Sequence, residues 1–233
     1  LEKDRTKIAK IEEVDNSILS PMEKMAKISL ILEHFSQSLS QDEQDRLEKE
    51  LEDKMKQKYQ DISKELEKTV IHKIAIDKDK LEYKTFGEVT GQVLNQFSMD
   101  ESQGYFRIAT TKSQTWSRYA EEEQKKSYSN MYVLDNDLKV VGSLEGLAEG
   151  EQIYSARFMQ NRAYLVTFRQ TDPLFAIDLS NPKNPKVLGK LKIPGFSNYL
   201  HPYDDNTLIG IGKDTGESEW GGVRTKGLKL TLF

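Results

Sequence analysis

The sequence has no cysteine, only three histidines among its 233 residues, and no long apolar run. Without cysteine, disulfide cross-links and thiolate chemistry are excluded. The histidines, His34, His72 and His201, do not have the spacing of metal ligands. No apolar stretch approaches the roughly 18 residues of a membrane-spanning helix, and a net charge of −4 does not indicate nucleic-acid binding. We therefore expect no metal, cofactor, nucleic-acid partner or membrane span in this chain.

Residue patterns that indicate a reaction are also missing. Ser155 and Ser197 have no base at a meaningful spacing, so no hydrolase nucleophile is predicted. Gly210-Ile211-Gly212 lies in a strand pattern without a following helix, unlike a phosphate-binding loop. The acidic pairs Asp100-Glu101 and Asp204-Asp205 fall at turns, where Asp is favoured without any cation. We assign no catalytic residue and lean against an enzyme.

The clearest structural signal lies between residues 154 and 194. Runs rich in β-branched and aromatic residues alternate there with turns rich in Asn, Asp, Pro and Gly. Such runs are typical of consecutive antiparallel strands. We predict four strands, at about residues 154–159, 163–168, 173–179 and 186–194, which form one complete sheet.

This four-strand unit recurs along the chain. Asp178, which closes its third strand, has a counterpart 43 residues earlier at Asp135, and Tyr164 has one 44 residues later at Leu208. Asp77 and Tyr105 fit the same pattern. A period of about 40 to 45 residues with four strands per repeat is typical of a β-propeller blade. A single blade cannot cover both of its faces, so neighbouring blades must stack.

We predict a mainly β fold, a partial β-propeller of four-stranded antiparallel blades plus an α-helical hairpin insertion. The expected parts are the hairpin at 1–68 and the partial propeller at 69–233, divided into part of a blade at 69–90, full blades at 93–145 and 152–194, and an incomplete blade at 196–233. Because propellers close with about four to eight blades, we expect a fragment of a longer protein. The incomplete blades would then offer edges for self-association.

Helical signals are confined to the first third of the chain. Residues 1–14 fit a short helix or a strand. Ser20-Pro21-Met22-Glu23 predicts a capped helix start, and Ser40-Gln41-Asp42-Glu43 predicts another. In the second helix, apolar residues recur at helical spacing and form one stripe: Leu47, Leu51, Met55, Tyr59, Ile62 and Leu66. We expect this stripe to pack against the first helix in an antiparallel hairpin, and partner binding is the alternative.

Four longer strings carry a resemblance to a known family. They are Leu94-Asn95-Gln96-Phe97-Ser98-Met99-Asp100, Arg157-Phe158-Met159, Thr167-Phe168-Arg169-Gln170-Thr171-Asp172-Pro173-Leu174-Phe175 and Gly195-Phe196-Ser197-Asn198-Tyr199-Leu200-His201-Pro202-Tyr203. They closely resemble a family of archaeal and bacterial secreted proteins with a C-terminal β-propeller distantly related to WD-type repeats. The resemblance covers about residues 66–233 and implies a position at or outside the cell surface. It implies no reaction.

Candidate binding residues follow from the meander of a blade. Loops between second and third strands share one face of a propeller with the links between blades, and three long insertions precede third strands here. One holds Trp116 and Tyr119 and another holds Trp220. Exposed Trp on a long loop often marks recognition. The expected binding residues are Trp116, Tyr119, Arg169, Asp172 and Trp220 on this face, with Arg157 and His201 on innermost strands lining the central channel.

These observations favour a non-catalytic binding or scaffolding module at the cell surface or outside the cell. The expected partner is a protein or a glycan. The alternative is an enzyme whose pocket, at the mouth of the channel, is completed by blades outside this chain.

Overall fold

The computed structural model describes residues 2–120, 122, 125–168, 172–193, 195–217 and 223–233. The chain divides into two compact units, a helical unit at Leu1–Lys58 and a sheet unit at Tyr59–Phe233. The sequence predicts the boundary between helices and sheets at residue 68. In the structure the second unit begins at Tyr59, so the last turns of the long helix are grouped with the sheets.

Three helices make up the helical unit. They are α1 (Glu2–Glu12), α2 (Pro21–Gln37) and the first part of α3 (Gln41–Leu66). The signals for helix starts are confirmed: the Ser20 hydroxyl accepts the Glu23 N–H, and the Glu23 carboxylate accepts the Ser20 N–H at 2.9 Å. At the start of α3, the Glu43 carboxylate accepts both the N–H and the hydroxyl of Ser40. Carboxylates in these first turns also face the positive end of the helix dipole.

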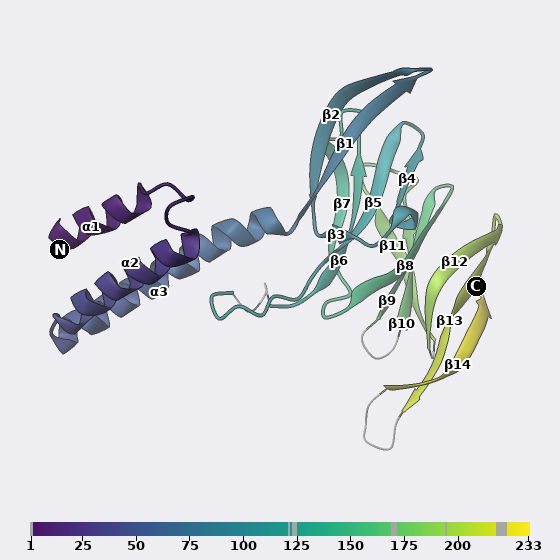
Figure 1. The fold of residues 1–233 in the computed structure, drawn as a ribbon. Coiled ribbons are helices and arrows are strands. Elements are labelled where there is room, and N and C mark those ends of the chain that lie inside the picture. Colours follow the sequence, from purple (N-terminus) through teal and green to yellow (C-terminus); the bar gives the residue numbers. More distant parts are fainter. Residues whose placement is uncertain (1, 121, 123–124, 169–171, 194, 218–222) are drawn as a thin grey trace. The chain divides into compact units, whose positions relative to one another are not determined.

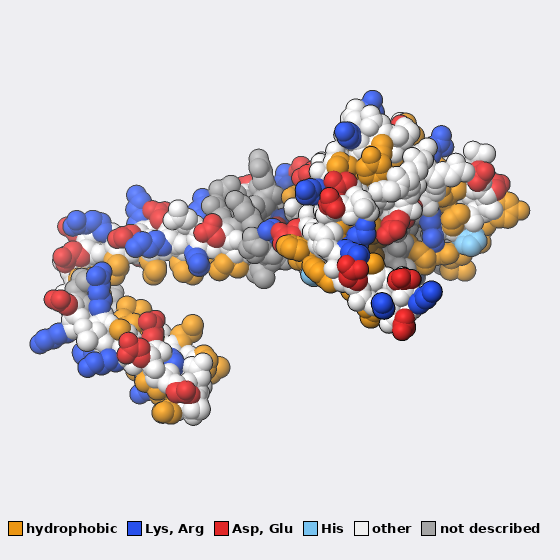
Figure 2. Space-filling model, turned by 90° about the horizontal axis from the view of Figure 1, so that it is seen from above, with side chains coloured by type: hydrophobic (Ala, Val, Ile, Leu, Met, Phe, Trp, Pro, Cys, Tyr) orange, Lys and Arg blue, Asp and Glu red, His pale blue; other side chains and the backbone are white. Residues whose placement is uncertain are grey.

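The apolar stripe of α3 is not covered within the helical unit. Leu47, Leu51 and Met55 are 39%, 59% and 44% exposed. The expectation that this stripe is buried against the preceding helix is therefore wrong. The three helices instead line a groove of about 520 Å³ whose apolar walls include Phe35 of α2, and Figure 2 shows the hydrophobic side chains that face this hollow.

The sheet unit contains four antiparallel sheets, shown in Figure 1. Sheet 1 pairs β1 (Lys68–Asp77) with β2 (Lys80–Thr90). Sheet 2 contains β3 (Gln92–Val93), β4 (Met99–Ser102), β5 (Tyr105–Lys112), β6 (Tyr128–Leu134) and β7 (Val140–Leu147). Sheet 3 contains β8 (Gln152–Met159), β9 (Arg162–Phe168), β10 (Asp172–Asp178) and β11 (Lys186–Ile193). Sheet 4 contains β12 (Phe196–Asp204), β13 (Thr207–Glu217) and β14 (Val223–Leu232).

Sheets 2 and 3 are complete meanders, and sheets 1 and 4 have two and three strands. The predicted fold class, a partial β-propeller with helices, is confirmed. In sheet 2 the first-strand position is divided between β3 and β4 by a short 3-10 helix, η1 (Gln96–Ser98). Asn95 causes this break because its side-chain oxygen accepts the Phe97 N–H at 3.0 Å, a local bond that competes with strand pairing.

Turns after the third strands explain the repeated aspartates. The Asp178 carboxylate accepts the Ser180 N–H at 2.9 Å, and this bond holds the pKa of Asp178 below its usual value. Asp135 likewise accepts the N–H groups of Asp137 and Lys139. Both residues satisfy backbone donors at tight turns, which is the usual reason for Asp at such places.

Apolar side chains fill the space between each pair of neighbouring sheets. Strand β6 shows the arrangement, because Met131 and Val133 pack toward sheet 3 while Tyr132 and Leu134 pack toward sheet 1. A third cluster joins sheets 3 and 4 through Val166, Leu174 and Leu200. Central strands buried on both faces are what stacked blades require.

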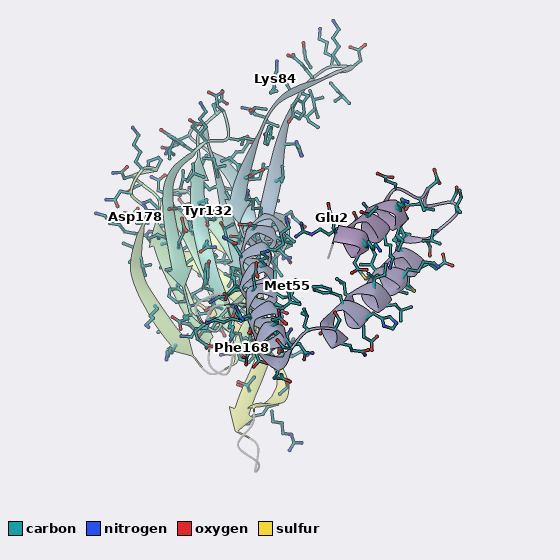
Figure 3. The ribbon with its side chains drawn as sticks, turned by 90° about the vertical axis from the view of Figure 1, so that its left-hand side faces the viewer. Glu2, Met55, Lys84, Tyr132, Phe168 and Asp178 are labelled. Carbon is teal, nitrogen blue, oxygen red and sulfur yellow. The ribbon has the colours of Figure 1, made fainter. Side chains whose placement is uncertain are left out.

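The two outermost sheets each present an apolar face that no described residue of the sheet unit covers. On sheet 1 the outward residues are 47–74% exposed: Val70, Ile74, Ile76, Leu81, Tyr83 and Phe86. On sheet 4, Leu228, Leu230 and Leu232 alternate along β14 and are 83%, 66% and 67% exposed. The tip of the β1–β2 hairpin, near Lys84, extends beyond the other strands (Figure 3).

Candidate functional site

The described ends of the second strands and the starts of the third strands lie at one end of the sheet unit. In Figure 1, β5, β9 and β13 end, and β6, β10 and β14 begin, at the same end of the sheet unit. Phe168, at the end of β9, and Asp178, at the end of β10, lie toward opposite ends of sheet 3 (Figure 3). We call the end that holds Phe168 the loop end. The strand ends that flank the predicted insertions thus share one end of the sheets, and the prediction that the insertions form one binding face stays a prediction.

The loop from β5 to β6 carries the aromatic residues of the predicted binding face. Trp116 is 87% exposed, so its indole does not pack on its own loop. Two residues on, Arg118 lies over the Tyr119 ring with its guanidinium carbon 4.7 Å from the centroid. The Tyr119 ring lies 6.4 Å from the ring of Tyr59, near the end of α3. Trp116, Arg118 and Tyr119 thus gather three recognition-prone side chains within four residues.

A turn and a buried anchor hold this loop in place. The Ser117 hydroxyl accepts the Tyr119 N–H at 3.1 Å, and the Ser117 carbonyl accepts the Ala120 N–H at the same distance. Ala120 is buried. We therefore expect Trp116 to be presented on an ordered turn.

The base of the loop is tied to the segment that connects α3 to β1. Lys112, the last residue of β5, is 2% exposed, and its Nζ lies 3.7 Å from a carboxylate oxygen of Glu67. Thr115 donates its hydroxyl hydrogen to the same carboxylate oxygen at 3.1 Å. A buried lysine requires such partners, so we interpret Lys112 and Glu67 as structural supports for the Trp116 loop.

The remaining residues predicted for this face do not add to the site. Arg169 and Trp220 lie outside the described residues. Asp172 is the first residue of β10 and pairs with Ile193, but its side chain is also outside the described part. Their predicted roles in binding stay predictions.

Arg157 and His201, predicted to lie on innermost strands, are connected through Tyr199. Arg157 is on β8 and donates its Nε–H to the Leu200 carbonyl of β12 at 2.8 Å. Its guanidinium lies 4.2 Å from the Phe97 ring centroid and 5.4 Å from that of Tyr199. The Tyr199 hydroxyl is 3.1 Å from His201 Nδ1. Sheets 3 and 4, together with η1 between β3 and β4, therefore contribute side chains to one cationic and aromatic cluster, which we call the inner cluster: Phe97, Arg157, Tyr199 and His201.

Sequence reasoning missed Phe97 and Tyr199. Tyr199 is 42 residues after Arg157, close to one repeat, so a closer alignment of the first strands could have found it. Phe97 is 60 residues before Arg157 and stands in η1 rather than in a strand, so the repeat period gives no signal for it.

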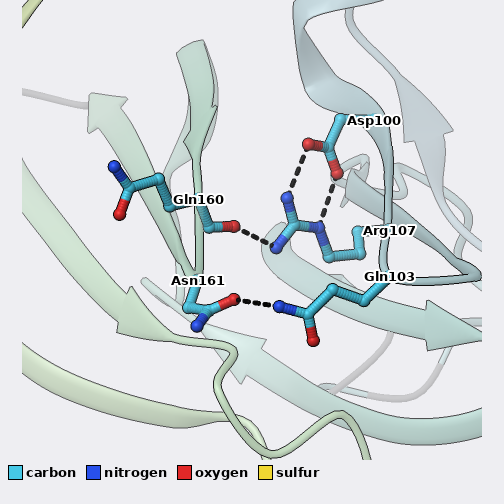
Figure 4. A network of polar contacts seen from close by, with 5 residues as sticks. All are labelled: Asp100, Gln103, Arg107, Gln160 and Asn161. Atoms are coloured by element: carbon cyan, nitrogen blue, oxygen red, sulfur yellow. Dashed lines mark hydrogen bonds and ion pairs between the residues drawn. The ribbon is translucent and has the colours of Figure 1, made fainter. Parts of the chain in front are cut away.

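A second polar network joins the turns at the opposite end of sheets 2 and 3 (Figure 4). Arg107 donates from Nε and Nη2 to the two carboxylate oxygens of Asp100, both at 2.5 Å, and from Nη1 to the Gln160 carbonyl at 2.7 Å. Beside it, the Gln103 amide donates to the Asn161 side-chain oxygen at 3.1 Å. Because Arg107 is 3% exposed and its groups are paired, this network clamps two sheets together.

Comparison with known proteins agrees with this geometry. The family model described as "Beta propeller domain" matches residues 14–233. The chain belongs to the β-propeller domain family. An uncharacterized protein of Methanocaldococcus jannaschii is 46% identical over 220 residues, which are 94% of this chain and 32% of that protein. An uncharacterized protein of Archaeoglobus fulgidus is 41% identical over 229 residues, 98% of this chain and 32% of its own length. The chain thus spans about a third of these two relatives.

Within the described residues, no group of three or more His, Asp or Glu side chains is placed to hold a metal ion. None of the described helices combines the length and hydrophobicity that crossing a membrane demands.

Proposed function

We propose that this β-propeller chain is a binding or scaffolding module at the cell surface or outside the cell, and that the Trp116 loop contacts a protein partner. The observation that carries the proposal is the 87% exposure of Trp116 on an anchored loop. Leaving a large aromatic ring in water gives up the free energy of burying it. Contact with a partner would recover that free energy.

The composition of the loop supports a protein more than a glycan. Trp, Tyr and Arg are the residues most enriched among interface positions that dominate binding energy, and Trp116, Arg118 and Tyr119 supply one of each. Arg118 already lies on the Tyr119 ring, so these two side chains lose less conformational freedom on binding. A glycan that stacks on Trp116 alone is the other outcome of the test.

The proposed location is supported by the resemblance of four strings of this sequence to secreted proteins whose propeller is distantly related to WD-type repeats. The alternative, an enzyme, still requires a pocket at the channel mouth that is completed by blades outside this chain. We also propose that the uncovered faces of sheets 1 and 4 mediate self-association when the chain is isolated. Exposed apolar faces of this kind are unusual on monomers.

Site-specific photocrosslinking tests the proposed contact. A benzophenone amino acid is placed at position 116, and at position 203 in a control, because Tyr203 is also well exposed, at 69%. Each protein is irradiated with the envelope fraction of the cells that produce it. We expect one protein to crosslink to position 116 and not to position 203. The Kd of that purified protein should then rise at least about thirtyfold with Trp116→Ala and stay unchanged with Tyr203→Ala.

Two results would contradict the proposal. Equal crosslinking at both positions would show that Trp116 has no special role. A crosslinked product that disappears after glycosidase treatment, with no protein remaining, would assign the loop to a glycan.

A further inference from the structure

The inner cluster holds a guanidinium whose hydrogen-bonding capacity is largely unused. A guanidinium carries five N–H donors, and Arg157 uses its Nε–H on the Leu200 carbonyl. Among the described residues, no acceptor lies within hydrogen-bonding distance of its two terminal nitrogens, and no carboxylate pairs with it. Arg157 is only half-buried, so these nitrogens can be reached from solvent.

Arg107 shows how the same chain treats an arginine with a purely structural role. Arg107 donates to both oxygens of Asp100 and to the Gln160 carbonyl. Its Nε and both terminal nitrogens therefore have protein partners. Both arginines lie over aromatic rings, since the guanidinium carbon of Arg107 is 5.2 Å from the centroid of the Phe158 ring. The two arginines differ in burial, since Arg107 is 3% exposed and Arg157 is half-buried, and in the carboxylate, which Arg157 lacks among the described residues.

The two aromatic rings beside Arg157 restrain the orientation of its guanidinium. Phe97 lies 4.2 Å from the guanidinium carbon and Tyr199 lies 5.4 Å from it, and the two rings contact each other edge to face at 5.4 Å. Aromatic contact together with the Nε bond restrains the guanidinium. A restrained guanidinium presents its terminal N–H groups as a fork, whose geometry matches the two oxygens of a carboxylate.

His201 adds a second polar group to the inner cluster, through its contact with Tyr199. Its Nδ1 is 3.1 Å from the Tyr199 hydroxyl, and the side chain is exposed. If the hydroxyl donates to Nδ1, the neutral ring carries its hydrogen on Nε2. Nε2 can then donate to a ligand oxygen. Tyr199 therefore links the guanidinium to a second donor.

We propose that the inner cluster is a binding site for a carboxylate, with Arg157 as the bidentate donor and His201 as an auxiliary donor. One fixed positive charge suits a monoanion better than a phosphate dianion, which usually meets several cationic groups. The carboxylate could belong to a free organic acid, to an acidic sugar or to an acidic peptide side chain. The site is separate from the Trp116 loop and does not depend on its proposed function.

Titration of the intact 233-residue chain tests this site. The probes are D-glucuronate for an acidic sugar, N-acetyl-L-glutamate for a peptide side chain, acetate for a small acid and inorganic phosphate for the competing anion. Binding is followed by calorimetry and by the arginine side-chain resonances in nitrogen-15 NMR spectra. We expect saturable binding of at least one carboxylate, with shifts of the Arg157 resonances and not of those of Arg162, an exposed arginine on β9.

Variants separate the fork from general charge effects. We expect Arg157→Gln to weaken carboxylate binding at least about tenfold, Arg157→Lys to restore part of it because the charge returns without the fork, and Arg162→Gln to leave it unchanged. His201→Gln should have a smaller effect than Arg157→Gln. Trp116→Ala should have none, which keeps this test separate from that of the Trp116 loop.

Clear outcomes would overturn the proposal. If none of the carboxylates shifts the Arg157 resonances of the unmodified chain, the site does not bind this class, whatever the variants do. If phosphate binds more tightly than every carboxylate, the assigned ligand class is wrong. If Arg157→Gln folds normally and binds as well as the parent, Arg157 is not the donor.

Discussion

Removing either partner of the Asp100 and Arg107 pair should destabilise the sheet unit, and Asp100→Ala should cost more than Arg107→Met. The two residues pair across the β4–β5 hairpin. The side chain of Arg107 is 4% exposed and that of Asp100 is 29% exposed. Removal of Asp100 strands a buried guanidinium, whereas removal of Arg107 leaves a carboxylate that water can reach.

The structure sets the magnitudes. Asp100→Ala deletes two charge-assisted bonds of 2.5 Å and leaves Arg107 with the Gln160 carbonyl alone. Breaking a buried pair costs about 3 to 5 kcal/mol, and some entry of water into the vacated space places the estimate at about 3 kcal/mol. Arg107→Met keeps the apolar packing on Phe158, and its remaining carboxylate is rehydrated, so we expect about 1 to 2 kcal/mol.

Urea unfolding followed by far-ultraviolet circular dichroism measures both changes in the free energy of unfolding. Glu101→Ala is the matched control, because Glu101 is the exposed neighbour of Asp100 on β4, and we expect a change within about 0.5 kcal/mol. The reasoning fails if Arg107→Met costs as much as Asp100→Ala, or if Asp100→Ala costs no more than the control.

Two further predictions concern close packing and uncovered faces. A Cβ at Gly212 would lie 1.7 Å from the Phe196 carbonyl oxygen, whereas one at Gly189 would meet no atom within 4 Å. Gly212→Ala should therefore lower the free energy of unfolding, measured by the same urea unfolding, by at least about 2 kcal/mol, and Gly189→Ala by no more than about 0.5 kcal/mol. Equal effects would contradict this. We expect light scattering after gel filtration to show that the isolated chain self-associates. The double variant Leu228→Glu with Leu230→Glu, on sheet 4, should make the chain monomeric, whereas the control Leu188→Glu with Leu191→Glu, on β11, should not. A parent chain that is monomeric at all concentrations would refute this.

Turn and cap chemistry made the fold predictable from sequence. Asp135 and Asp178 recur because each satisfies backbone donors after a third strand, so their spacing reports the repeat directly. The capped start at Ser20 is similarly local, since its partner Glu23 is three residues away. Interactions of this range depend on residue type at short spacing, which a sequence displays.

Contacts between sheets could not be predicted in this way. The guanidinium of Arg157 meets Phe97 and Tyr199 because of the stacking of three sheets and the break at η1, and no short spacing encodes these partners. The apolar stripe of α3 shows a different limit of sequence reasoning. Its period correctly indicated an amphipathic helix, but the period does not say whether another helix packs on the stripe. Leu51 remains 59% exposed.

The stacking of sheets restricts where this protein can carry out a function. Side chains on both faces of a central strand such as β6 are buried, with Met131 packed toward one neighbouring sheet and Tyr132 toward the other. Any substitution there changes stability first, because interiors are close-packed. Variation without loss of the fold is easier in loops and along the first strands of the sheets, where side chains such as Arg157 are only half-buried. The Trp116 loop and Arg157 lie in these two regions, which is why binding experiments should begin with them.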